Sequence, residues 1–251
     1  MFLNKKYCLF VFIFLILYLS FSFAESKDLR GIFNKGNKYY NEGEYSKALE
    51  AYQEILSEKT SPEVLYNAGC SAFKAGKIGL SLVYLQRAFN IIPRDPDLRK
   101  LRSEIKSKIS ESGGVLMRPI DSPVLSFFNK NEYAVSFCLL FFLLFSLILL
   151  NKKLKKDLFW VYFSLSSCLV VISICFIIYT IRFSGDYVAV TSPTAEVREV
   201  QKIEEPSFYI LRDGSEVKLI SLENGWAKIG FDGRDGRYFE GWVPEKDITK
   251  I

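Results

Sequence analysis

The chain has 251 residues, a net charge of +5 and no histidine. This small net charge does not favour a nucleic-acid-binding protein. The lack of histidine excludes Ser-His-Asp and Cys-His catalytic groups and histidine zinc ligands. Only one cysteine, Cys70, falls outside the leader and the apolar stretches described below, so no disulfide can form within either soluble part. No convincing catalytic pair of carboxylates is found either. We therefore expect a non-enzymatic protein without a metal or cofactor.

The first 24 residues have the pattern of an export signal peptide. Lys5 and Lys6 form a basic start, Cys8–Phe23 is apolar, and Ser22 and Ala24 are small residues at positions −3 and −1 of a cut after residue 24. The alternative is an uncleaved anchor helix. Both interpretations place the following residues outside the cytoplasm.

Two apolar stretches, Tyr133–Leu150 and Leu158–Ile181, are each long enough to cross a hydrocarbon core of ~30 Å as a helix. The lysine-rich residues 151–157 between them predict a short cytoplasmic loop. We therefore expect transmembrane helices at 132–150 and 158–181, with both soluble domains on the outer side. A buried hairpin of a soluble domain is the alternative, although residues 134–150 carry no charge that could form a polar face.

Between Leu29 and Pro93 the sequence repeats with a period of 33 residues, a spacing typical of helical hairpin repeats. Gly36 and Gly69 are predicted where the two helices of each hairpin cross closely. Gly43 and Gly76 are predicted to end the first helix of each hairpin, because a positive φ favours glycine there. A further helix at 97–109 is expected to cap the open end of the stack.

Residues 25–111 resemble the tetratricopeptide repeat family. The residues at its signature positions are Gly36, Ala48, Gly69, Ala88 and Pro93. The resemblance implies an all-α domain that binds an extended peptide or a partner helix on the concave face of its first helices.

This resemblance also indicates which residues would line that protein-binding face. They are Phe33, Asn37, Tyr40, Asn41, Tyr66, Cys70, Phe73 and Lys74 from the first helices, with Arg99 and Lys106 from the final helix. An aromatic groove with basic rims suggests an apolar or mildly acidic peptide. An equally good interpretation is that Tyr40 and Phe73 pack between neighbouring hairpins.

Residues 112–131 lack periodicity and contain two prolines, so they are predicted to form a linker. Residues 186–251 consist of short alternating stretches separated by turn pairs such as Asp213-Gly214 and Asn224-Gly225. Five strands are expected, at 187–191, 196–200, 215–220, 227–231 and 241–244. Five short strands in a small domain predict a closed β-barrel.

The motifs Asn224-Gly225-Trp226 and Gly241-Trp242-Val243 resemble a bacterial SH3-type domain. The segment Glu199–Tyr209 is longer and more acidic than that family's usual turn, which borders its ligand groove. Trp226 and Trp242 are interpreted either as barrel core or as a ligand platform, and core is favoured.

Taken in order, these parts predict a multidomain membrane protein: all-α tetratricopeptide hairpins, two transmembrane helices and a C-terminal all-β SH3-like barrel. It resembles the BatE-like family of the bacterial aerotolerance (Bat) system. The resemblance implies a membrane-anchored scaffold of the bacterial inner membrane, acting in aerotolerance or envelope stress. The implied partners are von Willebrand A-type Bat membrane proteins and, through them, a MoxR-type ATPase. The alternative is an anchor or envelope sensor whose SH3-like domain binds peptidoglycan.

Overall fold

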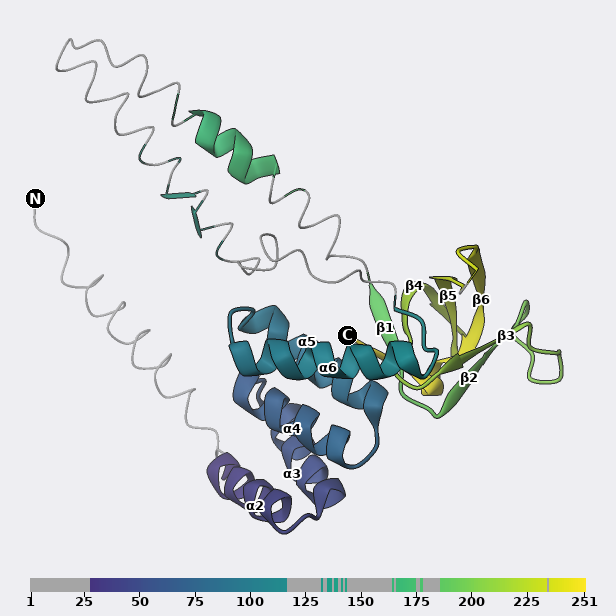
Figure 1. Cartoon of the computed structure of the whole chain (residues 1–251), viewed down its shortest axis with the longest axis horizontal. Helices are drawn as coiled ribbons and strands as arrows, with labels where there is room; N and C mark the ends of the chain where they lie inside the picture. Colours follow the sequence, from purple (N-terminus) through teal and green to yellow (C-terminus); the bar gives the residue numbers. More distant parts are fainter. Residues whose placement is uncertain are drawn as a thin grey trace, which may run out of the picture.

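The computed structural model describes residues 28–116, 186–233 and 235–251, together with residues 132, 135, 136, 138, 139, 141, 143, 164, 166–174 and 177. A helical N-terminal domain and a C-terminal domain of antiparallel strands occupy the long ranges (Figure 1). The predicted export signal at 1–24 and the predicted loop at 151–157 lie outside the described residues.

The helical domain consists of two helical hairpins and a final helix that packs on the second hairpin. The hairpins are α2 (Leu29–Asn41) with α3 (Tyr45–Glu58) and α4 (Pro62–Lys74) with α5 (Ile78–Ile91), and the final helix is α6 (Pro96–Glu111). Gly43 and Gly76 follow α2 and α4 with φ of +80° and +78°, as the sequence predicted.

The two hairpins depend on glycine where their helices cross. A Cβ atom added to Gly36 would lie 2.8 Å from Cε1 of Tyr52, and one added to Gly69 would lie 2.7 Å from Cγ of Leu85. In the second hairpin the Ser81 hydroxyl also donates to the carbonyl of Gly69 at 2.7 Å. The predicted close crossings are therefore present, and each is filled by a large side chain of the second helix.

Seven strands form the C-terminal domain. They are β1 (Tyr187–Val190), β2 (Thr194–Val197), β3 (Tyr209–Arg212), β4 (Glu216–Glu223), β5 (Trp226–Asp232), β6 (Tyr238–Pro244) and β7 (Ile248–Lys250), with a short 3-10 helix, η1 (Glu245–Asp247), before the last. One sheet has the order β6-β5-β4-β1-β7 and the other pairs β2 with β3. The backbones of Arg198 and Trp242 join the two sheets through a pair of hydrogen bonds of 2.9 and 2.8 Å.

The prediction of two transmembrane helices, at 132–150 and 158–181, is corrected by the structure. No helix in the described part of the chain is long and apolar enough to cross a membrane. Residues 166–174 are helical. Most other residues of the two segments lie outside the described residues. The fold class is therefore corrected to a helical hairpin domain followed by an antiparallel sheet domain.

The two domains pack directly against each other, with α5 against β1. The Asp213 carboxylate, in the turn before β4, accepts hydrogen bonds from the backbone N–H groups of Ile78 at 3.0 Å and Gly79 at 2.9 Å. These N–H groups belong to the first residues of α5 and have no acceptor within the helix. A side chain of the other domain therefore caps them. A Cβ on Gly79 would lie 2.0 Å from the carbonyl oxygen of Val190, so only glycine fits this contact.

A second set of contacts lies beside this cap. The backbone of Val115 accepts from the N–H of Glu216 at 2.8 Å and donates to the Ser215 hydroxyl at 3.1 Å, and its side chain belongs to the core of the β domain. The Glu216 side chain is completely buried, and Nζ of Lys106 in α6 lies 3.5 Å from its carboxylate. The first residues after α6 therefore extend directly into the β domain.

The crossing at Gly69 gives a stability prediction. Gly69→Leu should lower the free energy of unfolding by at least ~1–3 kcal/mol, because the new side chain overlaps Leu85 in a packed core. Ser46→Leu, at an exposed position of α3, is the control and should change stability by no more than about 0.5 kcal/mol. Urea unfolding of the full chain, followed by helical circular dichroism, measures both. Equal midpoints for the two variants would contradict the close crossing.

The cap on α5 gives a second prediction. Asp213→Ala should lower the free energy of unfolding by ~0.5–2 kcal/mol, because two backbone N–H groups at the start of α5 lose their acceptor. Hydrogen exchange at the Ile78 and Gly79 amides should accelerate. Asp232→Ala, at an exposed position at the end of β5, is the matched control. If amide exchange in α5 is the same in both variants, Asp213 is not the cap.

Candidate functional site

A hollow of about 340 Å³ opens on the helical domain where α2, α3 and α4 meet. It is lined by side-chain amides, phenols and one thiol. The lining residues are Asn37, Tyr40, Asn41, Tyr52, Tyr66, Asn67 and Cys70. We call this site the amide hollow. Its lining includes no charged side chain.

Tyr52 forms the floor of the amide hollow. Its ring fills the space left by Gly36 and is 1% exposed, and its hydroxyl donates to Oδ1 of Asn37 at 2.6 Å. Burial raises the pKa of Tyr52 to about 12. Since the bond to Tyr52 uses the carbonyl oxygen of Asn37, the amide N–H groups of Asn37 are left for a ligand.

The rest of the lining is also neutral at physiological pH. Burial, together with the neighbouring Cys70 thiol, raises the pKa of Tyr66 to about 12. Burial raises the pKa of Cys70 as well, which keeps this thiol protonated and makes it a poor nucleophile. Burial also raises the pKa of Tyr40. The hollow therefore offers hydrogen bonds and aromatic surface, but no charge.

Five residues predicted for the binding face come together in the amide hollow: Asn37, Tyr40, Asn41, Tyr66 and Cys70. Tyr40 lines the hollow and also contacts the second helix of its own hairpin. Its ring contacts Tyr45 with the centroids 5.3 Å apart, and the remaining surface lines the hollow.

The other first-helix residues lie beside the hollow and do not line it. The Phe33 ring contacts Tyr52, with the centroids 5.9 Å apart. Phe73 packs against the helical core, and Nζ of Lys108 lies 4.4 Å from its ring centroid. Lys74 is exposed at the end of α4.

The two basic residues predicted for the rim are used inside the protein. The Arg99 guanidinium donates to the carbonyl of Pro93 and lies over the ring of Phe89. Lys106 pairs with the buried Glu216 of the β domain. The lining of the amide hollow therefore contains no cation that could attract an acidic peptide.

Sequence reasoning missed two lining residues, Tyr52 and Asn67. Tyr52 occupies the repeat position of Leu85, which the period assigns to packing alone. A tyrosine in place of leucine was the available signal, because a buried hydroxyl needs a hydrogen-bond partner. Asn67 stands one helical turn before Cys70 on the face that carries Tyr66, yet it is outside the positions that the repeat marks.

No group of three or more cysteine, aspartate or glutamate side chains in the described part of the chain is placed to hold a metal ion. Comparison with protein-family models gives no match to this chain, and comparison with curated proteins gives no significant match. The assignment of function must therefore rest on the geometry of the site.

The buried phenol at the floor of the amide hollow gives a pH prediction. The folded-state pKa of Tyr52 is raised from 10.0 to about 12, so its contribution to stability is present below pH ~10 and lost as the pH rises through ~12. Between these values the wild type should lose up to ~1.4 kcal/mol more per pH unit than Tyr52→Phe. Unfolding curves at pH values of about 9 to 12 measure this. Parallel pH profiles would contradict the raised pKa.

Proposed function

We propose that this protein is a non-enzymatic scaffold whose amide hollow binds a segment of a partner protein. The observation that carries the proposal is the convergence of three side-chain amides and three phenols, from α2, α3 and α4, on one neutral hollow. Such a lining can recognise polar groups in any ligand that presents both donors and acceptors.

A peptide backbone fits this chemistry well. Asn37 offers its amide donors, and Asn41 and Asn67 offer carbonyl acceptors as well as amide donors, so together they can pair with both polar groups of a peptide unit. The rings of Tyr40 and Tyr66 add contact area at a small cost in conformational entropy. A volume of about 340 Å³ accommodates only a few residues, so the affinity of the isolated site is modest.

The sequence supports a more specific form of this proposal. The period of 33 residues supports assignment of the helical domain to tetratricopeptide repeats, and the motifs around Trp226 and Trp242 support an SH3-like β domain. Their order supports a BatE-like role with von Willebrand A-type Bat proteins and, through them, a MoxR-type ATPase. The export-signal pattern at 1–24 supports action in the bacterial periplasm.

Site-specific photocrosslinking in living cells tests the scaffold function. A photoreactive phenylalanine analogue at Asn41 should crosslink to one defined protein, whereas the same analogue at the exposed Lys59, beyond the end of α3, should not. Adding Tyr66→Ala and Asn67→Ala to the Asn41 probe should reduce the crosslink at least about tenfold, as expected when hot-spot contacts are lost.

Lys74→Ala is the matched control, because Lys74 is exposed and lies next to the hollow without lining it. This variant should keep the crosslink, and the melting temperature of every variant should be measured alongside. A crosslink that survives the double substitution in a folded protein would contradict the proposal.

A further inference from the structure

The β domain has strands at the edges of its sheets, and β3 is one of them. In the two-stranded sheet, β3 pairs with β2, and no other described strand pairs with β3. The strands of the larger sheet follow one another in the order β6-β5-β4-β1-β7. An open strand edge presents backbone donors and acceptors that another strand can use.

The ladder with β2 shows which backbone groups face that open side. The N–H of Asp213 donates to the carbonyl of Pro193, and Leu211 stands opposite Ala195 in the same register. Because hydrogen-bonded residues alternate along an antiparallel pair, Leu211 faces β2, and Ile210 and the N–H of Arg212 face away. No hydrogen bond in the described part of the chain uses either of these two N–H groups.

A groove of about 520 Å³ runs beside this edge. Its lining residues are Ser207, Phe208, Tyr209, Ile210, Arg212, Asp235 and Phe239. The Tyr209 and Phe239 rings contact each other with the centroids 5.8 Å apart, and the Phe208 ring lies 6.3 Å from that of Phe239. Ile210 is 56% exposed and Phe208 40% exposed, so apolar surface remains open at the edge.

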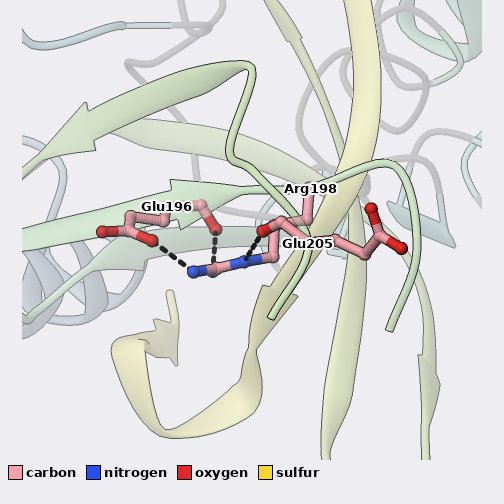
Figure 2. A network of polar contacts seen from close by, with 3 residues as sticks. All are labelled: Glu196, Arg198 and Glu205. Atoms are coloured by element: carbon pink, nitrogen blue, oxygen red, sulfur yellow. Dashed lines mark hydrogen bonds and ion pairs between the residues drawn. The ribbon is translucent and has the colours of Figure 1, made fainter. Parts of the chain in front are cut away.

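The segment that leads into this groove is held by a buried arginine. Arg198 is 8% exposed, and its guanidinium pairs with the Glu196 carboxylate, while its Nε donates to the carbonyl of Glu205 at 2.9 Å (Figure 2). The N–H of Phe208 then donates to the carbonyl of Val197 at 3.0 Å. The bonds of Glu205 to Arg198 and of Phe208 to Val197 therefore hold the long acidic segment before β3 in place. The groove exists without a ligand.

The charges of the groove indicate what it would accept. Two lining residues are charged, and the Asp235 carboxylate is paired with Nε of Arg237 at 2.5 Å. Arg212 is exposed and makes no ion pair with any described residue. The groove therefore offers apolar rings next to one available cation.

We propose that the open edge of β3 binds an extended, acidic segment of a partner protein by strand addition. The backbone of that segment pairs with Ile210 and with the N–H of Arg212. One of its apolar side chains contacts Phe208 and Phe239, and a carboxylate lies beside Arg212. Backbone pairing supplies the affinity, and the two side-chain contacts supply the selectivity. This site is separate from the amide hollow and does not depend on its function.

The test uses the isotope-labelled full chain and two blocked peptides, Ac-Val-Glu-Val-Glu-Val-NH2 and Ac-Val-Lys-Val-Lys-Val-NH2. The glutamate peptide should shift the Ile210 and Arg212 amide resonances and slow their hydrogen exchange. It should bind roughly two- to fivefold more tightly than the lysine peptide, the range of one exposed ion pair. Arg212→Glu should reverse that preference.

A matched pair of variants at Ile210 separates strand addition from mere hydrophobic contact. Ile210→Pro removes an N–H that faces away from β2, so the domain should stay folded and binding should weaken at least about tenfold. Ile210→Thr loses similar apolar surface but keeps the N–H, and should bind more tightly than Ile210→Pro.

Three results would overturn the proposal. One is that neither peptide binds at millimolar concentration, which would mean that the edge of β3 is hydrated and is not a binding site. Another is equal binding of both peptides. The third is equal affinity of the two Ile210 variants, provided that circular dichroism shows both to be folded.

Discussion

The turn at residues 213–216 places polar groups, of which Ser215 and Glu216 are completely buried, against the helical domain and the residues that follow it. Asp213 accepts from the N–H groups at the start of α5, Ser215 and Glu216 pair with the backbone of Val115, and the Glu216 carboxylate forms an ion pair with Lys106. A buried polar group without a partner costs ~1–3 kcal/mol, and a buried charge costs more. Separating or rotating the domains would expose or orphan all of these groups together. The turn therefore holds the two domains in one relative orientation.

This orientation matters for both proposed binding surfaces. The amide hollow lies among α2, α3 and α4, whereas the contact with the β domain uses α5, α6 and residue 115. The strands that meet α5 are β1 and β7, and the contact of Asp213 with α5 lies one residue beyond the end of β3. Docking the domains thus fixes the geometry between the two surfaces. A rigid spacing between two modest sites suits a scaffold, because two bound segments of one partner reinforce each other.

Features with a local cause could be predicted from the sequence, and features of long-range origin could not. Gly69 and Gly76 mark a crossing and a helix end within one hairpin, so the repeat period locates them. Gly79 stands at the repeat position that Ser46 occupies in the first hairpin. The glycine there is explained only by its close contact with Val190 and Asp213, which lie far along the chain. The local sequence around Lys106 likewise cannot show that this residue lies in the interface with the β domain. The transmembrane prediction considered apolar length alone, and the described helices do not support it.

The most direct measurement of the fixed orientation is a set of residual dipolar couplings from backbone amides of the full chain in one aligning medium. A single alignment tensor should fit the amides of residues 29–111 and 187–250 together, because the turn at 213–216 makes them one rigid body. Two tensors of different magnitude or orientation would show that the domains reorient independently, and would contradict the account.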